Sequence, residues 1–264
     1  MKTVQLDDLG REVRLPTRIV RAVTLAPNLT EIVFAAGAGD VLVGSDDFSD
    51  HPPPAKRLPK VGGMQPDVEK ITALRPDVVL ASTEGNQPSL APALAAVGVP
   101  LFVVKTDRLN QIASSISRVG SLLGSSFGET AASTLRDQIG RQRRRRPIAP
   151  RVLFAVWADP LYVGGTGTFA DDLITLCGGR NAVVVKGWPQ YSQESLIAMP
   201  PDIFLYPDAS VTRQSVEKLF DAQPELLRRV QLVPVDENVF TRPGPRVVDA
   251  AARLNEIIDA WQMR

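Results

Sequence analysis

The sequence is poor in the residues that metal sites, disulfides and many catalytic pairs require. It contains one cysteine, Cys177, and one histidine, His51, among 264 residues. One cysteine cannot form an internal disulfide, and the usual zinc sites draw on several His or Cys ligands. A Cys–His catalytic pair would have to join Cys177 to His51. The apolar segment "LITLCGG" around Cys177 favours instead a small buried residue at a helix end.

Long apolar runs and an excess of either charge are also missing. No run approaches the roughly 20 apolar residues that span a bilayer, and the start, "MKTVQLDDLGREV", lacks the apolar core of a signal peptide. Such a start fits either a cytosolic protein or an exported one whose signal has been removed. The formal net charge of +1 gives no argument for nucleic acid, so we expect no nucleic-acid partner.

Three segments resemble ligand-binding loops without completing one. "GAGDVL" at Gly37 follows a predicted helix, which indicates a helix stop and not a dinucleotide loop. "GGTGTF" at Gly164 lacks the lysine of a phosphate loop and predicts a turn into a helix. The acidic residues of "SDDFSDHPPP", residues 45–54, could hold a hard metal, but the prolines favour a rigid surface loop. We expect no catalytic residue, no metal site and no resident cofactor.

Short apolar runs alternate with helix-like segments along both halves of the chain. The runs are "RIVRAVTL", "DVLVGS", "PDVVLAS" and "PLFVVK", then "RVLFAV", "PDIFLYP" and "VQLVPV". Continuous apolar runs are typical of parallel strands buried on both faces, and their alternation with helices predicts an α/β fold. Before them, "VQLDDLGREVRLP" predicts a hairpin that turns at residues 8–10. We therefore expect two Rossmann-like α/β lobes.

One element occurs twice. "VEKITALRPDVVL", residues 68–80, and "QESLIAMPPDIFL", residues 193–205, share a glutamate, an alanine, a Pro-Asp pair and a leucine at the same spacing. The repeat follows from two lobes of one plan.

A long helix is predicted between the lobes. Ser126 and Glu129 have the spacing of a capping box, and Phe127 begins an apolar repeat of four residues. Arg143–Arg146 would end this helix, where cations favour the helix dipole. Residues 127–146 would span about 30 Å. We expect an N-terminal lobe over 1–108, a linker with this helix over 109–147 and a C-terminal lobe over 148–264.

Aromatic and polar residues follow the predicted strands, where open α/β sheets bind ligands. They suit a large, flat, partly apolar ligand in a cleft between the lobes. They are Asn28, Phe48, Glu84, Tyr162, Trp188, Asn238 and Arg242.

At this point the chain resembles a known family, the substrate-binding proteins of cobalamin and ferric-siderophore ABC importers. The resemblance rests on residues 18–63, on "VEKITALRPDVVLAS", on "WPQYSQESL" and on "PGPR", and it covers residues 7–261. "SDHPP" and "WPQYSQE" are most similar to the cobalamin-binding branch. The resemblance implies two lobes joined by one backbone helix, with the ligand between them. It also implies that Glu69 and Glu194 meet arginines on the importer's two membrane subunits. As an alternative, each glutamate would only stabilise its helix dipole.

For the pocket, the resemblance implies contacts from Phe48, where the cobalamin branch has a tyrosine, and from Tyr162, where it has a phenylalanine. Trp188 and Arg242 match in type, and Asn238 stands where an aspartate is expected. Two tryptophans of that branch are replaced near Gly63 and Ser82. Trp157 is a candidate to supply part of the lost surface.

We therefore expect a periplasmic or extracytoplasmic, monomeric protein that captures a corrinoid, cobalamin foremost, and delivers it to an ABC importer. Its native precursor would carry the export signal and could be lipid-anchored. Phe48, Tyr162 and Trp188 would stack on the ligand, and Asn28, Asn238 and Arg242 would orient it. A ferric siderophore or haem is the alternative ligand. The competing class is a two-lobe α/β enzyme, which would need a phosphate loop or an acid/base pair, and neither is evident.

Overall fold

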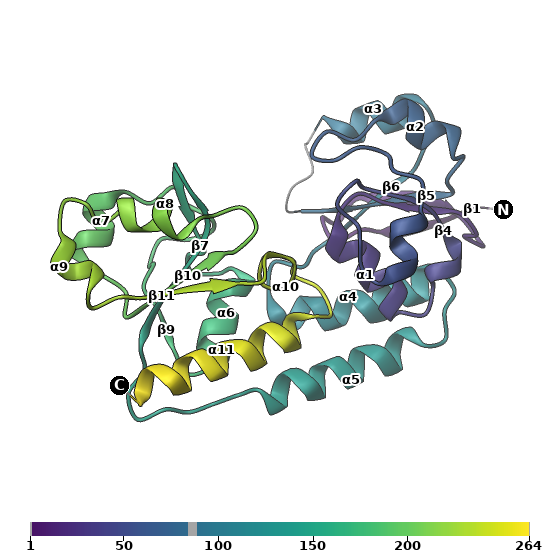
Figure 1. Cartoon of the computed structure of the whole chain (residues 1–264). Coiled ribbons are helices and arrows are strands. Elements are labelled where there is room, and N and C mark those ends of the chain that lie inside the picture. The colour runs from purple at the N-terminus through teal and green to yellow at the C-terminus, as the bar shows by residue number, and fades with distance from the viewer. Residues whose placement is uncertain (1, 84–88, 264) are drawn as a thin grey trace. The chain divides into compact units, whose positions relative to one another are not determined.

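The computed structural model describes residues 2–83 and 89–263. The chain forms two compact units, Met1–Arg136 and Asp137–Arg264, and each contains a sheet of mainly parallel strands with helices packed on it (Figure 1). The predicted α/β class with two lobes is confirmed. Among the described residues, no helix is both long and apolar enough to cross a membrane.

Unit 1 begins with the predicted hairpin and continues as a four-stranded parallel sheet in the order β4-β3-β5-β6. Its strands are β1 (Lys2–Leu6), β2 (Glu12–Pro16), β3 (Ala22–Thr24), β4 (Leu42–Ser45), β5 (Val78–Ser82) and β6 (Leu101–Val104). Its helices are α1 (Pro27–Ala35), α2 (Val68–Ala73), α3 (Leu90–Ala96) and α4 (Leu109–Leu122), with short 3-10 turns at η1 (Gly39–Val41) and η2 (Pro53–Arg57).

Unit 2 repeats this plan with one added antiparallel strand. Its sheet has the order β11-β10-β7-β8, and β9 pairs with β7 beside this path. The strands are β7 (Arg151–Ala158), β8 (Leu161–Val163), β9 (Arg180–Asn181), β10 (Ile203–Pro207) and β11 (Gln231–Val235). The helices are α6 (Phe169–Leu176), α7 (Gln193–Ala198), α8 (Arg213–Lys218), α9 (Pro224–Leu227), α10 (Glu237–Phe240) and α11 (Val247–Gln262).

The repeated Pro-Asp pair has the same structural role in both units. In unit 1, the carboxylate of Asp77 accepts hydrogen bonds from the backbone N–H groups of Val20 and Arg21, at 2.9 and 3.0 Å. In unit 2, the carboxylate of Asp202 accepts one from the N–H of Arg151 at 2.7 Å. Each aspartate also donates its own N–H to the carbonyl of Arg21 or Arg151, at 2.8 Å in both cases. These bonds align the start of one central strand with the start of its neighbour.

The helix predicted over residues 127–146 is shorter. It forms α5 (Gly128–Arg141), about 21 Å long at roughly 1.5 Å per residue, and the boundary between the two units falls inside it. Ser126 does not cap this helix; the carboxylate of Glu129 accepts instead from the Ser117 hydroxyl at 2.5 Å.

Placing Arg143–Arg146 in the last helical turn was wrong, because these residues make contacts with distant parts of the chain. The N–H of Arg144 donates to the carbonyl of Leu176 at 2.9 Å. The guanidinium of Arg146 donates to the carbonyl of Cys177 at 2.8 Å and to Asn255 Oδ1 at 3.0 Å, and it pairs with Asp259. This segment therefore leaves the helical path and joins unit 2.

Cys177 is the small buried residue that its apolar surroundings predict. It is fully buried, and its thiol lies 3.4 Å from the carbonyl of Ala251. Burial raises the pKa of the thiol to about 12, against the opposing effect of Arg146 and Arg144. The thiolate that a catalytic nucleophile needs is therefore absent near neutral pH.

Replacing Asp77 or Asp202 with alanine should lower the free energy of unfolding by about 1–3 kcal/mol each. Each change leaves the N–H groups at the start of β3 or β7 without a charged acceptor. Urea denaturation followed by circular dichroism measures the loss. Asp221→Ala is the matched control, since Asp221 is exposed and should change stability by less than about 0.5 kcal/mol. Equal stabilities for all three variants would contradict the structural role of the Pro-Asp pair.

Candidate functional site

In unit 1, two of the predicted residues follow strands at the carboxyl edge of the sheet. Asn28 lies in α1, just after β3, and is only 5% exposed. Its side-chain amide donates to Thr106 Oγ1 at 2.9 Å, which joins the segments that follow β3 and β6. Phe48 follows β4 and is 55% exposed. Glu84 lies outside the described residues. Phe48 is thus exposed on the surface, whereas the Asn28 amide forms a buried hydrogen bond within the unit.

Hydrogen bonds from buried and half-buried polar side chains stabilise the loop that carries Phe48. Asp46 accepts hydrogen bonds from the Phe48 N–H, at 3.0 Å, and from the Ser49 hydroxyl. The Ser49 hydroxyl also meets that of Thr30 at 2.6 Å. The ammonium of Lys60 donates to the carbonyl of Ser49 at 2.5 Å and to that of Ala55 at 3.3 Å. Burial lowers the pKa of Lys60, while the attraction of Asp46 and its acidic neighbours opposes that shift.

Gly63 leaves the space that the ring of Phe48 occupies. A Cβ on Gly63 would lie 2.8 Å from Phe48 Cε2, which is closer than carbon atoms approach without a shift. The sequence resemblance places a tryptophan of the cobalamin branch near this position. In this chain the ring of Phe48 occupies the space beside Gly63, so a side chain at position 63 would require that exposed ring to shift.

In unit 2, Trp188 is held over Gly164 by buried aromatic rings. Its ring centroid lies 5.6 Å from that of Phe169 and 6.5 Å from that of Phe154, the latter in an edge arrangement. A Cβ on Gly164 would lie 3.1 Å from Trp188 Cζ3 and 2.9 Å from Ala170 Cβ. The half-buried indole is thus held by these two rings, as aromatic pairs of this geometry favour.

Trp157 and Tyr162 form an exposed aromatic pair next to this position. They are partners in the antiparallel ladder of β7 and β8, and Tyr162 bridges to Gln190 on its other side. Partners directly opposite each other place their side chains on one face. The two rings are 48% and 38% exposed, and Trp157 Nε1 donates to the carbonyl of Asp159 at 2.8 Å. The indole therefore has its polar atom satisfied and presents its apolar surface.

Gly164 comes two positions after Tyr162, so both belong to the same face of the ribbon. From this alternation we infer that Trp157, Tyr162 and Trp188 lie on one face, which we call the aromatic surface of unit 2. The expectation that Trp157 supplies aromatic surface is consistent with this arrangement. Its position opposite Tyr162 could not be predicted, because a register shift between Ala155 and Trp157 creates it.

Asn238 and Arg242 lie after β11, around the short helix α10. The carboxylate of Asp236 caps this helix by accepting from the N–H of Asn238 at 2.8 Å. Phe240 is buried on its inner side and stacks on Phe154 at 6.3 Å. The carbonyl of Asn238 accepts from Arg246 at 3.0 Å. The Asn238 and Arg242 side chains are both half-buried, and their contact with a ligand stays a prediction.

Glu69 and Glu194 occupy equivalent positions. Asp67 caps α2 by accepting from the Lys70 N–H, and Ser192 caps α7 by accepting from the Ser195 N–H. Each glutamate is the second helical residue after its cap and is exposed. Hydrogen bonds from its own backbone N–H and from Ser192 lower the pKa of Glu194. Both carboxylates therefore suit the helix dipole and remain available to a partner.

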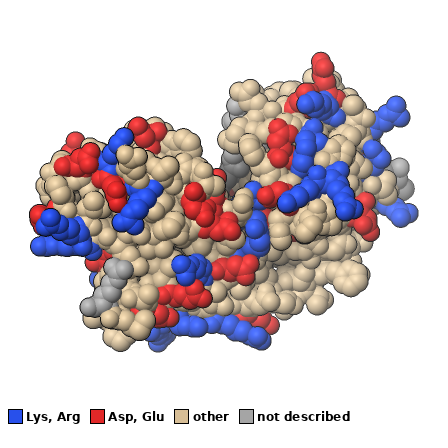
Figure 2. Space-filling model, viewed as in Figure 1, with Lys and Arg blue, Asp and Glu red and all other residues tan. Residues whose placement is uncertain are grey.

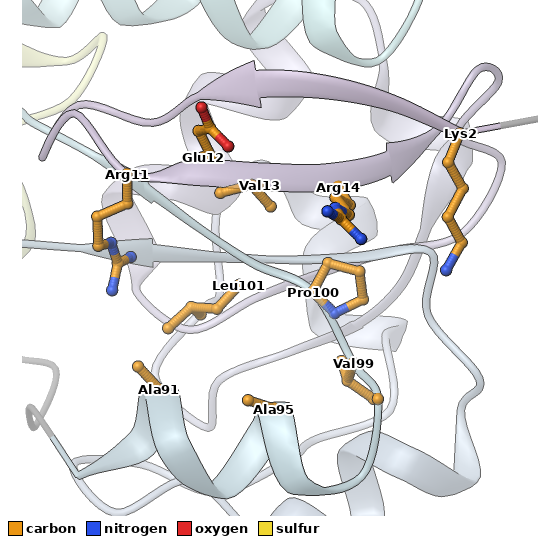
Figure 3. Close-up of a pocket in the computed structure, with 11 residues that line it drawn as sticks. Lys2, Arg11, Glu12, Val13, Arg14, Ala91, Ala95, Val99, Pro100 and Leu101 are labelled. Carbon is orange, nitrogen blue, oxygen red and sulfur yellow. The ribbon is translucent and has the colours of Figure 1, made fainter.

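A groove of about 520 Å³ in unit 1 lies away from these residues (Figure 3). The hairpin lines one side of it with Lys2, Arg11 and Arg14, and residues just before β6 line the other. It therefore opens at the amino end of β6, where α/β sheets do not bind their ligands. In residues 2–83 and 89–263, no three His, Cys, Asp or Glu side chains gather to hold a metal ion.

Gly164→Ala should displace the Trp188 ring, because the added methyl group would meet both that ring and Ala170. We expect a loss of about 1–3 kcal/mol in the free energy of unfolding, with a changed near-ultraviolet circular dichroism spectrum. Gly140→Ala is the control, since nothing lies within 4 Å of the added atom, and it should be neutral or slightly stabilising. An unchanged aromatic spectrum in Gly164→Ala would refute the close contact.

Two solved structures that are similar to this chain are named for binding haem and vitamin B12. The chain is similar to the periplasmic heme-binding protein RhuT from Roseiflexus sp. RS-1 in apo form, with a TM-score of 0.77 and 30% identity over 89% of this chain and 96% of that one. It is also similar to the periplasmic vitamin B12 binding protein BtuF of Vibrio cholerae, with a TM-score of 0.76 and 26% identity over 94% and 100%.

Sequence relatives agree with the structural ones. The vitamin B12-binding protein of Yersinia pestis (strain Pestoides F) is 32% identical over 241 residues, 89% of this chain and 84% of the relative. That of Pectobacterium carotovorum subsp. carotovorum (strain PC1) is 31% identical over 248 residues, 91% and 87%. A model of the family described as periplasmic binding protein matches residues 23–226. The chain therefore belongs to the periplasmic binding protein family.

Proposed function

We propose that this protein captures a cobalt corrinoid, cobalamin foremost, outside the cytoplasm and delivers it to an ABC importer. The observation that carries the proposal is the aromatic surface of unit 2, which displays Trp157, Tyr162 and Trp188 at the carboxyl edge of its sheet. A corrin ring is broad, flat and largely apolar, so it fits such a surface. Relatives 31–32% identical are named vitamin B12-binding proteins.

Unit 1 would contribute a second aromatic contact through Phe48. The ring is exposed on a loop that buried hydrogen bonds already hold in place, so little order has to be created when the ligand binds. Asn238 and Arg242 are the half-buried polar groups near α10. Side-chain amide and guanidinium groups of this kind would donate to the amide rim of a corrinoid, and Asn28 would support the loops from inside.

Haem is the second candidate ligand. The similarity to RhuT, a heme-binding protein at 30% identity, favours it, and a porphyrin is also flat and apolar. Because the two tryptophans expected near Gly63 and Ser82 are missing, the site would accept either a corrin or a porphyrin ring. A ferric siderophore is less favoured, because Arg242 by itself cannot balance a strongly anionic chelate.

We also propose that Glu69 and Glu194 dock the loaded protein on the two membrane subunits of the importer. The equivalence of their positions, one on the first turn of α2 and one on the first turn of α7, supports this role. Acidic and basic side chains are mixed over the face seen in Figure 2, so docking would depend on particular carboxylates. We expect a monomeric protein in the periplasm or its equivalent, as its relatives are periplasmic.

Calorimetric titration with cyanocobalamin should give one-to-one binding, with haemin and a ferric hydroxamate run in parallel. Trp157→Ala should weaken binding about tenfold, which corresponds to about 1.4 kcal/mol, because it removes half of the exposed aromatic pair. Trp188→Ala should weaken it at least as much. Trp261→Phe, at the end of α11, is the matched control and should bind normally.

The three ligands separate the outcomes of this titration. Binding of haemin alone would move the assignment to haem and retain the aromatic surface as its site. A corrinoid bound equally well by Trp157→Ala and Trp188→Ala would show that the aromatic surface is not the site. Turnover of a substrate by the purified protein would instead support the enzyme alternative.

Glu69→Lys and Glu194→Lys should each abolish ligand delivery and leave ligand affinity unchanged, because charge reversal would repel arginines on the importer. The measurement is uptake of labelled ligand into vesicles that contain the cognate importer. Asp40→Lys in unit 1 and Asp221→Lys in unit 2 change exposed carboxylates elsewhere and should preserve uptake. Normal uptake by both glutamate variants would leave the two residues with helix stabilisation as their only role.

A further inference from the structure

The arginines at and after the end of α5 form the densest run of one charge in the chain. Arg141, Arg143, Arg144 and Arg145 lie within five residues and are all exposed. The whole chain has 30 Lys and Arg against 29 Asp and Glu, so this excess of positive charge is local. Because like charges close together repel one another and destabilise the compact state, the run calls for a role beyond solubility.

Three of these arginines have no side-chain partner in the part of the chain that the structure describes. No described residue forms an ion pair or a hydrogen bond with the guanidinium of Arg141, Arg143 or Arg145. The guanidinium of Arg144 donates only to the backbone carbonyls of Arg141, at 2.9 Å, and of Arg143, at 3.0 Å. The side chain of Arg146, by contrast, is 5% exposed and ion-paired. Arg146 therefore has a structural role, while the charges of its neighbours are uncompensated.

The segment that carries the run is held against α11. The carbonyl of Gln142 accepts a hydrogen bond from the side chain of Asn255 at 2.8 Å. The carbonyl of Ile148 accepts one from the side chain of Gln262 at 2.9 Å. Figure 2 shows Lys and Arg side chains along the lower edge of the view, below α11. The arginines are therefore displayed from a fixed backbone on one surface of unit 2.

Exposed apolar side chains border these arginines. Ile148, three residues after Arg145, is 66% exposed, and Met263, at the end of α11, is 82% exposed. The hydrogen bond between Gln262 and Ile148 joins the two segments, and Trp261 is half-buried on the same last turn. Basic side chains beside exposed apolar ones, with a tryptophan near them, are the combination that suits the interface of an anionic lipid bilayer.

We propose that this part of unit 2 binds reversibly to a membrane that contains anionic phospholipids. We call it the basic surface of unit 2, and its members are Arg141, Arg143, Arg144, Arg145, Ile148 and Met263. The guanidinium groups donate paired N–H bonds to headgroup phosphates, and the two apolar side chains enter the boundary between headgroups and acyl chains. A soluble polyanion has no apolar layer to receive these two side chains. The inference goes beyond the proposed function and does not depend on which ligand is captured.

The basic surface and the proposed docking residue Glu194 belong to opposite faces of the sheet of unit 2. Helix α11 packs with α6 on one face, whereas α7, which carries Glu194, packs with α8 on the other (Figure 1). A molecule that contacts lipid through the basic surface therefore keeps Glu194 away from the lipid. Membrane contact and importer docking use separate residues, so each can be measured without the other.

Sedimentation of the protein with lipid vesicles tests the inference. Vesicles of equimolar phosphatidylcholine and phosphatidylglycerol should bind the wild-type protein, and vesicles of phosphatidylcholine alone should not. Added sodium chloride should release the protein, because salt screens exposed charges. The double variant Arg143→Gln/Arg145→Gln should bind the anionic vesicles about 25-fold more weakly, since each arginine near the surface contributes about fivefold. Ile148→Ser should bind them about threefold more weakly.

Arg213→Gln/Arg228→Gln is the matched control, because it removes the same charge from two exposed arginines elsewhere in unit 2. It should bind the anionic vesicles as the wild type does, and circular dichroism checks that all variants fold. Equal binding by the wild type and Arg143→Gln/Arg145→Gln, or no binding by the wild type, would overturn the inference. Normal vesicle binding by Ile148→Ser, together with equally tight binding of soluble polyphosphate by the wild type, would overturn the assignment to lipid.

Discussion

The carboxylates of Asp77 and Asp202 hold the starts of two neighbouring central strands together, and the candidate site depends on this alignment. Each aspartate accepts from the backbone at the start of β3 or β7 and donates its own N–H to the same segment. The pairing of β3 with β5, and of β7 with β10, then follows in register. Because a slip of one residue would turn every side chain to the opposite face, these bonds determine where the loops beyond the carboxyl ends begin.

Glycines next to the aromatic side chains at those ends leave the space that the rings occupy. Gly63 leaves room for Phe48, and Gly164 leaves room for Trp188. Buried rings of Phe154 and Phe169 support Trp188 from one side, while the register of β7 and β8 places Trp157 against Tyr162. Rings held in this way lose little freedom on contact with a flat ligand, so more of the contact energy is available for affinity.

In the repeated helix, one exposed glutamate carboxylate can contribute both to helix stability and to recognition. The side chain of Asp67 or Ser192 accepts from one N–H of the first turn, and a glutamate two residues later lies at the positive end of the helix. An exposed carboxylate in that position stabilises the helix and, in the proposed function, meets an arginine of the importer. Duplication of one element in two units supplies two such carboxylates without any specialised structure.

The sequence by itself determined the α/β class, the hairpin, the burial of Cys177 and the equivalence of the two Pro-Asp elements, because these depend on local composition and spacing. Only the tertiary structure decided where α5 ends, since Arg146 bonds to groups more than thirty residues away. It likewise turned the Asn28 amide inward to Thr106. A register shift in β7 placed Trp157 opposite Tyr162. Strict alternation along the strand would have placed Trp157 on the same face as the buried Ala155. Contacts between distant segments outweigh local preference at these positions, and a local pattern contains no information about them.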